Sequence, residues 1–311
     1  MKAFYNRRGD DEMKWKALTK NYELYILLLP ALLYFAVFHY WPMYGVQIAF
    51  KNYVTTQGIW GSSWVGLKHF SEFVNSYLFW QLFRNTIEIT VYSLVIGFPV
   101  PIILALMMNE LRSARFKKAV QTITYAPHFI STIVLVSMLT FFLSPQTGLI
   151  NKVIYFFGGS PIPFLTSPEW FKTIYVFSGV WQTAGWSSII YMAALATIDP
   201  QINEAAVIDG ASRMQRIWYI NIPGIFPTIV ILLILSVGNL MSVGFEKIYL
   251  MQNPLNMESS DIITTYVYRR GIQQSQYSFA SAVGLFNSII NFILLVMVNR
   301  IAKGLKQSSL W

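Results

Sequence analysis

The segment EAAVIDGASRMQRIWYINIP, residues 204–223, is a polar loop between two long apolar segments of the chain. Asp199, just before it, suits the cap of a helix, and Pro200 suits the first helical position. Glu204 is expected early in that helix, where negative charge meets the positive helix end. Gly210 permits a backbone turn that a side chain would hinder. A polar helix-turn-helix in an otherwise apolar chain suggests a docking surface.

The composition is that of a membrane protein. Of the 311 residues, 55% are hydrophobic, 16% aromatic and only 12% charged, which is far more apolar than a soluble globular domain. The runs that are long enough to cross a hydrocarbon core of ~30 Å cover residues 24–50, 86–108, 120–143, 173–196, 225–245 and 279–299. We therefore expect an all-α polytopic membrane protein with about six transmembrane helices. There are no cysteines, which excludes disulfides and thiolate metal sites.

The positive charge follows the expected topology. Of the 23 Lys and Arg residues, 15 lie before the first span, after the second, after the fourth and after the sixth, and 8 lie in the alternate segments. Lys and Arg accumulate on the cytoplasmic side of membrane proteins. Both termini and the polar loop are therefore expected in the cytoplasm, and no basic face for nucleic acid is evident.

Residues 1–23 are expected to form a cytoplasmic N-terminal segment, and residues 24–311 one transmembrane domain with a cytoplasmic loop at 197–224. Basic residues before an apolar run also describe a signal peptide. The run is too long for one, and Phe38-His39-Tyr40-Trp41 offers no small-residue cleavage site. We therefore expect an uncleaved first span.

Several expected spans contain helix-breaking residues. Gly97, Pro99 and Pro101 should kink the second span, and Pro127 and Pro227 interrupt the third and fifth. Irregular helices are tolerated where protein or a cavity surrounds them, so the pattern fits a moving pathway. The alternative is structural, because Pro and Gly are frequent in transmembrane helices.

The chain lacks the motifs of an energy-converting site. No Gly-x-x-x-x-Gly-Lys-Ser/Thr sequence occurs, and the sequence holds neither metal-spaced clusters nor a nucleophile elbow. Glu88 is the only acid inside an apolar run, and Arg84 lies one turn earlier on the same face, so we expect a structural ion pair. The energy for transport must then come from another subunit, or transport is passive. The chain itself is not expected to be an enzyme.

The loop resembles the EAA loop of ABC-importer permeases. It has Glu-Ala-Ala, three residues, Gly210, nine residues, Ile220, one residue, an aliphatic residue and Pro223, and only the Leu usual before the proline is replaced, by Ile222. In that family the loop forms a coupling helix that inserts into a cleft on a separate ATPase subunit. The resemblance assigns ATPase coupling to Glu204, Ala205, Ala206, Asp209, Gly210, Ala211, Arg213 and Pro223.

Other segments resemble the carbohydrate-uptake branch of the family. Trp64-Val65-Gly66-Leu67-Lys68-His69-Phe70 is similar to a signature that follows the first span of such permeases, with His69 where Asn is common. Trp181-Gln182-Thr183-Ala184-Gly185-Trp186 and Ile208-Asp209-Gly210-Ala211-Ser212-Arg213 resemble the LplB-type polysaccharide or oligosaccharide permeases. The resemblance runs from about residue 24 to the end. It implies the type I (MalF-like) importer fold in a bacterial cell membrane.

The partners follow from the same resemblance. They are an ABC ATPase dimer that supplies ATP and Mg²⁺ chemistry, a second homologous permease, an extracellular or periplasmic solute-binding protein, an oligosaccharide substrate and membrane lipid. No cofactor or metal is expected on this chain.

A sugar offers hydroxyls and apolar ring faces, so its pathway should present amides, hydroxyls and aromatic rings. The candidates within the spans are Trp181, Gln182, Trp186, Asn239, Asn287 and Asn291. Each has a structural alternative, since buried Asn residues often join helices and Trp residues often only pack.

Two other functions were weighed. A secondary transporter or channel for a small polar solute would favour mid-membrane carboxylates and an inverted repeat, and neither is evident in the sequence. A membrane enzyme of glycan assembly would need clustered acids near one interface, whereas the loops hold only scattered Glu246, Glu258 and Asp261.

Overall fold

A computed structural model describes residues 22–238, 241 and 244–304. The chain divides into two compact units, Met1–Gly66 and Leu67–Trp311. The expected N-terminal segment 1–23 lies almost wholly outside the described residues.

The first unit is one long apolar helix followed by a short ribbon. The helix runs through α2 (Tyr22–Phe35), η1 (Ala36–Tyr40), α3 (Trp41–Met43) and η2 (Tyr44–Phe50). Two short strands, β1 (Lys51–Asn52) and β2 (Ser63–Trp64), then pair antiparallel around α4 (Gly58–Gly61) with Lys51 opposite Trp64. The Trp64 ring stacks on Phe50 with centroids 5.8 Å apart.

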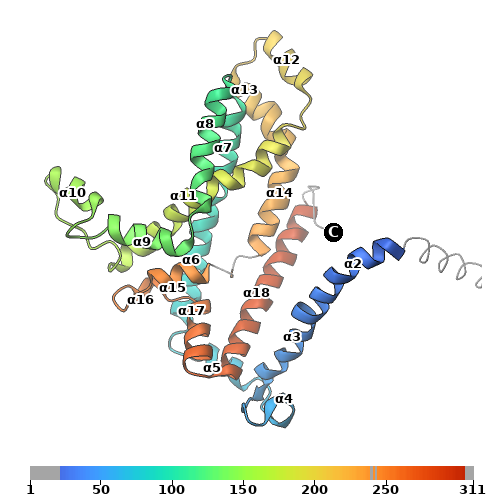
Figure 1. The fold of residues 1–311 in the computed structure, drawn as a ribbon, viewed down its shortest axis with the longest axis vertical. Helices are drawn as coiled ribbons and strands as arrows, with labels where there is room; N and C mark the ends of the chain where they lie inside the picture. The colour runs from blue at the N-terminus through green and yellow to red at the C-terminus, as the bar shows by residue number, and fades with distance from the viewer. Residues whose placement is uncertain (1–21, 239–240, 242–243, 305–311) are drawn as a thin grey trace, which may run out of the picture. The chain divides into compact units, whose positions relative to one another are not determined.

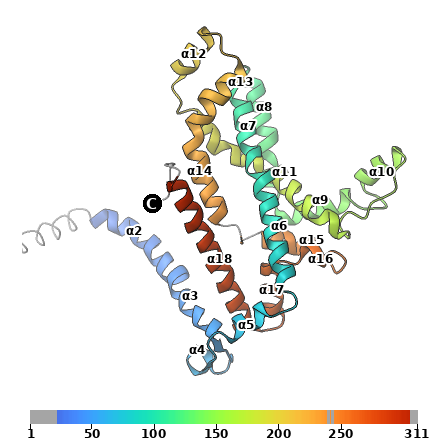
Figure 2. The same cartoon turned by 180° about the vertical axis from the view of Figure 1, so that it is seen from behind.

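The second unit is helical throughout its described residues. Its first half comprises α5 (Lys68–Val74), α6 (Phe79–Gly97), α7 (Pro99–Asn109), α8 (Ala114–Tyr125), η3 (Ala126–Phe129), α9 (Thr132–Phe142), α10 (Leu149–Phe156) and α11 (Pro168–Leu195). Its second half comprises α12 (Pro200–Ile208), α13 (Arg213–Arg216), η4 (Ile217–Asn221), α14 (Ile222–Gly238), α15 (Phe245–Met251), α16 (Met257–Ser260), α17 (Ile263–Tyr268), η5 (Arg269–Gln273) and α18 (Tyr277–Gly304). Figures 1 and 2 show the α7–α8 junction with α12 and α13 at one end of this unit and α5 with α17 at the other. We name these the α12 end and the α5 end.

Four described helices are long and apolar enough to cross a membrane: Tyr22–Phe50, Phe79–Asn109, Arg213–Gly238 and Tyr277–Gly304. A bent pair, Ala114–Phe129 with Thr132–Phe142, would make a fifth. The fourth expected span corresponds to α11, which has 28 residues but carries many Ser, Thr and Gly residues and is not among these helices. The membrane character of the chain is thus confirmed, and the count of six stays a prediction.

The third expected span is not straight. Its two halves, Ala114–Phe129 and Thr132–Phe142, meet at an angle of 98°, and Pro127 lies in η3, the last turn of the first half. Proline has no N–H to donate to the preceding turn. A new helix, α9, begins after the bend, and Ser131 caps it by accepting a hydrogen bond from Val134 N at 3.4 Å. In the second span, by contrast, Phe98 keeps helical dihedrals between Gly97 and Pro99, so residues 79–109 form one 31-residue helix.

The fifth expected span starts in a wide turn. The Ile222 N–H donates to Ile217 O, one residue further back than in an α-helix. Pro223 follows directly, and since its ring crowds the backbone of the preceding turn, the wide π-turn η4 gives that turn more room.

Three buried clusters hold the second unit together. Phe73, Phe79, Tyr266 and Phe279 bring aromatic rings together at the α5 end. A second cluster joins α6, α9, α11 and α15, and includes Phe171 and Ile248. The third packs Leu106, Tyr191, Leu195 and Ile225 under the polar loop. This last cluster joins α7, α11 and α14, the helices from which the candidate site is built.

Candidate functional site

The loop from Asp199 to Pro223, which we name the 199–223 loop, turns at Gly210. The φ of Gly210 is +80°, a left-handed conformation that favours glycine. Gly210 N donates to Val207 O at 3.1 Å and Ala211 N donates to Ala206 O at 2.8 Å. These two bonds form a Schellman motif, which satisfies the last carbonyls of α12. The expected turn is confirmed.

Both helices of the loop begin with a side-chain cap. Asp199 Oδ1 accepts from Gln201 N at 2.9 Å, with Pro200 at the first helical position as expected. Ser212 and Gln215 form a capping box at the start of α13, where each side chain accepts from the other residue's N–H. The expectation for Glu204 needs correction, because the first turn of α12 contains no acid. Glu204 lies in the second turn, beyond the free N–H groups of the helix start.

Several large apolar side chains of the loop are exposed. Neither α12 nor α13 has a buried residue. The exposed fractions are 51% for Ile202, 54% for Val207, 85% for Ile208 and 62% for Met214. Large exposed apolar side chains within one short polar segment point to an interaction surface, and we name these four residues together the apolar patch.

The residues to which the resemblance assigns coupling lie on or beside this patch. Exposed residues are Glu204, Ala205, Asp209, Gly210, Arg213 and Pro223, whereas Ala206 and Ala211 are half-buried. The structure thus brings all eight into one short segment of the α12 end.

A partly buried ion pair attaches the loop to α7. Arg216 Nη2, at the end of α13, lies 2.8 Å from Glu110 Oε2, and the two side chains are 18% and 14% exposed. Glu110 follows the last residue of α7. Asn221 Nδ2 donates to the other oxygen of the same carboxylate at 3.5 Å, and Asn221 is 1% exposed.

Glu110, Arg216 and Asn221 are not among the site residues that the sequence predicts. A signal for Glu110 was present, since it is the only acid in the basic segment 109–118. Its partner lies 106 residues away, which no local pattern could identify. Beside the pair is a hollow of about 500 Å³, lined by Glu110, Arg112, Asn203, Glu204, Arg213 and other residues of α7, α11 and the loop.

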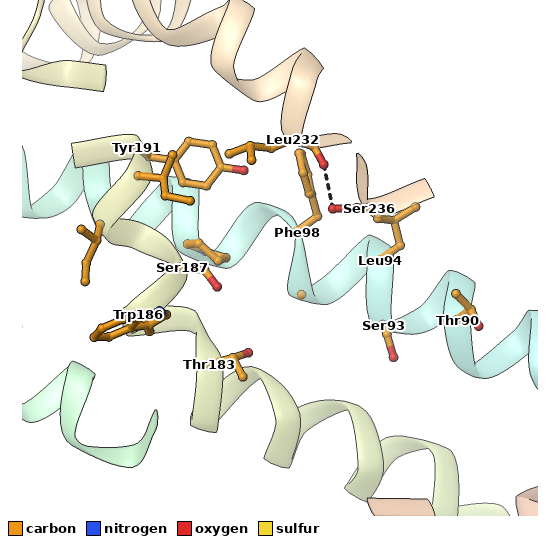
Figure 3. A pocket seen from close by; sticks show the side chains of 14 residues that line it. Thr90, Ser93, Leu94, Phe98, Thr183, Trp186, Ser187, Tyr191, Leu232 and Ser236 are labelled. Atoms are coloured by element: carbon orange, nitrogen blue, oxygen red, sulfur yellow. Dashed lines mark hydrogen bonds between the residues drawn. The ribbon is translucent and has the colours of Figure 1, made fainter. Parts of the chain in front are cut away.

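A cavity of about 620 Å³ lies between α6, α7, α11 and α14. Its wall is made of hydroxyls and apolar or aromatic side chains, and contains no charged residue: Thr90, Ser93, Leu94, Gly97, Phe98, Pro101, Thr183, Trp186, Ser187, Ile189, Ile190, Tyr191, Leu232 and Ser236. Figure 3 shows Thr183, Trp186 and Ser187 on one helix, with Ser93 and Phe98 on another. The Ser93 hydroxyl is buried without a hydrogen-bond partner among the described residues. Such a wall can contact the hydroxyls and the apolar ring faces of a sugar.

Of the expected pathway residues in α11, Trp186 lines the cavity. Its ring also stacks on His128 of the η3 bend, with centroids 4.5 Å apart and planes at 4°. Gln182 Nε2 donates to Ile130 O in the same bend at 2.8 Å. Trp181 is 48% exposed and does not line the cavity. Gln182 therefore attaches the bend to α11, and Trp186 both holds the bend and lines the cavity.

The expected pathway residues in α18 contact the backbone beyond α14. Asn287 Nδ2 donates to Met241 O at 3.1 Å, and Asn291 Oδ1 accepts from Met241 N at 2.7 Å. Both amides thus contact the backbone of one residue, Met241, which is the structural alternative for these Asn residues. Asn239 lies outside the described residues.

The α5 end carries a second interhelix ion pair. Arg84 Nε lies 2.6 Å from Glu88 Oε1, as the sequence predicts, and Lys172 of α11 pairs with the other oxygen of Glu88. Within the described part of the chain, no three His, Cys, Asp or Glu side chains are grouped so that they could hold a metal ion.

Comparison with protein families matches residues 97–307 to the model described as "Binding-protein-dependent transport system inner membrane component". The chain is 45% identical over 296 residues to the polygalacturonan/rhamnogalacturonan transport system permease protein YteP of Bacillus subtilis (strain 168), covering 95% of this chain and 92% of the relative. It is also 45% identical over 295 residues to protein LplB of the same organism, covering 95% and 93%.

Among solved structures, one chain of a bacterial alginate ABC transporter, in complex with an alginate pentasaccharide-bound periplasmic protein, matches with a TM-score of 0.88. The identity is 40%, over 95% of this chain and 99% of that chain. The fold described above is therefore that of a type I ABC importer permease.

Proposed function

The chain belongs to the family of binding-protein-dependent transport system inner membrane components, the permeases of ABC importers, and we propose that it forms half of the pathway through which an ATP-driven importer takes up an oligosaccharide. The substrate class is supported by relatives whose names specify polygalacturonan/rhamnogalacturonan, arabinooligosaccharides and alginate. It is supported further by the uncharged hydroxyl and aromatic wall of the cavity. The other half of the pathway comes from a second, homologous permease.

Coupling to an ATPase subunit is supported chiefly by the apolar patch on the 199–223 loop. Ile208, at 85% exposed, lies one position before the C-cap of α12. An apolar side chain so placed in a polar loop is stabilised by a partner that removes it from water. The partner is a cytoplasmic ATPase subunit, as a dimer that holds ATP and Mg²⁺.

The orientation of the chain agrees with this assignment. The α12 end contains Arg112, Arg115, Lys117 and Lys118 after α7, and basic residues favour the cytoplasmic side. Both termini then lie in the cytoplasm, and the α5 end faces the extracellular or periplasmic binding protein that delivers the sugar. ATP binding and hydrolysis move the ATPase subunits, and the loop passes that motion to the helices around the cavity.

The proposal is tested by purifying the chain from its host under mild conditions and identifying the subunits that accompany it. We expect an ABC ATPase, a second permease and a binding protein. Recovery of the chain without any ATPase would favour the alternative, a secondary transporter or channel.

The patch itself is tested with Ile208→Asp, because a buried charge in place of an aliphatic contact removes a central interface residue. We expect roughly tenfold less ATPase in the purified complex. Tyr77→Asp is the matched control, since Tyr77 is 91% exposed and precedes α6 at the α5 end. Equal loss of ATPase in both variants would show a general defect and contradict the assignment.

A further inference from the structure

The Glu110 carboxylate is shared by two residues that flank the π-turn η4. Arg216 precedes the turn and contacts Oε2 at 2.8 Å. Asn221 ends the turn and contacts Oε1 at 3.5 Å. One side chain from the end of α7 thus holds both ends of the segment that joins the loop to α14.

This contact is the main polar attachment of the loop. Of the ion pairs between described residues, those of His69, Arg84, Lys172 and Arg269 lie outside the 199–223 loop. Only the pair of Arg216 with Glu110 joins the loop to another helix. α12 and α13 bury none of their residues, and the apolar contacts of the loop with the buried cluster come from Ile217 and Ile222. The ion pair adds to these contacts a directional attachment at the end of α7.

The two helices that meet at Glu110 both reach the cavity. The 31-residue helix 79–109 ends directly before Glu110, which is its C-cap. It lines the cavity with Ser93, Phe98 and Pro101. On the other side, α14 follows Asn221 and lines the cavity with Leu232 and Ser236. A displacement of the loop is therefore passed to α14 by the covalent chain and to helix 79–109 by the ion pair.

We propose that Glu110 is a positioning residue for energy coupling, whose carboxylate fastens α13 and η4 to α7 so that the loop moves two walls of the cavity together. This inference rests on the proposed function, since it concerns how the motion of an ATPase reaches the pathway. Without the fastening, the loop still binds the ATPase and still moves α14. Helix 79–109 then no longer follows, and ATP is hydrolysed with little transport.

The first test uses the complete transporter in proteoliposomes, with uptake and ATP hydrolysis measured together. Glu110→Gln keeps the size of the side chain and removes its charge. We expect the ATPase subunits to remain bound and ATP hydrolysis to persist, while sugar taken up per ATP falls about tenfold. The charge-reversed pair Glu110→Arg with Arg216→Glu should restore at least about a third of the wild-type ratio, which loss of folding would not allow.

Glu88→Gln is the matched control. Glu88 also joins two helices through an ion pair, between α6 and Lys172 of α11, but at the α5 end. We expect this variant to keep the wild-type uptake per ATP, even if its thermal stability falls. An equal fall in uptake per ATP in Glu88→Gln would show that any lost interhelix pair uncouples the transporter, and would overturn the inference.

The second test replaces the ion pair by a removable link. The chain has no cysteine, so Glu110→Cys with Arg216→Cys can be bridged by a short bifunctional methanethiosulfonate reagent in a transporter with cysteine-free partners. Uptake per ATP should be low before bridging, rise with the bridge and fall again after dithiothreitol. A ratio that does not respond to the bridge contradicts a fastening role.

The outcomes separate this inference from the proposed function. If Glu110→Gln transports normally per ATP while Gly210→Pro does not transport, the positioning role is wrong and the coupling loop stands. If neither change affects ATP-driven uptake, the importer function stands, and both the coupling role of the loop and the positioning role of Glu110 are wrong. If no uptake by the wild type depends on ATP, the proposed function itself is wrong.

Discussion

The 199–223 loop and the cavity between α6, α7, α11 and α14 are built in opposite ways. The helix starts and the turn of the loop are shaped by hydrogen bonds between residues at most five positions apart, such as Ala211 N to Ala206 O, and its bonds to Glu110 attach it to α7. The cavity is walled by residues as distant as Thr90 and Ser236. A locally determined element keeps its shape while it moves, whereas a wall made of four helices changes shape whenever one helix shifts. This difference suits the loop to transmit motion and the cavity to respond to it.

The largest effect on sugar uptake is expected at Gly210, on which the turn of the loop depends. Proline cannot adopt the Gly210 φ of +80°, because its ring fixes φ near −65°. Proline would also remove the N–H group that donates a hydrogen bond to Val207 O. Gly210→Pro should reduce sugar uptake to less than about a tenth, measured with radiolabelled substrate in vesicles. Membrane insertion should be unchanged, since the residue does not span the bilayer.

Gly210→Asn is the matched control for the turn. Asn tolerates the left-handed conformation better than other side chains, so this variant should keep more than about half of the uptake. Equal uptake in Gly210→Pro and the wild type would mean that the shape of the loop is not needed for transport.

A smaller effect is expected at the cavity wall. Trp186 lines the cavity while Trp181, one turn away on α11, does not. If a sugar ring packs on Trp186, then Trp186→Ala should raise the half-saturating sugar concentration roughly fivefold. Trp181→Ala should change it by less than about twofold. Equal shifts in both variants would show that α11 packing, rather than contact with the sugar, determines the result.

The smallest expected effect concerns Ser93. Ser93 lines the cavity, and its buried hydroxyl has no partner among the described residues, so we expect it to bond a sugar hydroxyl when the side chain rotates toward the cavity. Ser93→Ala should raise the half-saturating concentration about twofold, in line with one net hydrogen bond. Ser236→Ala is the comparison, because the Ser236 hydroxyl already donates to Leu232 O at 2.8 Å. A larger shift in Ser236→Ala than in Ser93→Ala would contradict this reading of the wall.

The same contrast explains what the sequence could predict. Asp199, Pro200 and Gly210 act on their immediate neighbours, so the helix and the turn followed from local rules. The assignment of ATPase coupling to residues of this loop came from the family resemblance alone and stays a prediction. The pairing of Arg84 with Glu88 followed because both lie on one helix face. The type of fold followed from composition and from the family resemblance.

The remaining features depend on tertiary packing. Arg216 and Glu110 meet across 106 positions, and neither residue type identifies its partner. Asn287 and Asn291 share one helix face as expected, yet their contact is the backbone of Met241. Pro127 marked a break in the third span, but neither the 98° angle nor the stack of His128 on Trp186 of α11 could be predicted from the residues around it.

If an ATPase subunit covers the exposed residues of the 199–223 loop, a photo-reactive p-benzoylphenylalanine at position 208 will lie against that subunit. Irradiation of intact host membranes should then cross-link position 208 to a nucleotide-binding subunit, whereas position 77 should give no such cross-link. Efficient incorporation at position 208 without any cross-link to a nucleotide-binding protein would contradict the assignment of an ATPase to this loop.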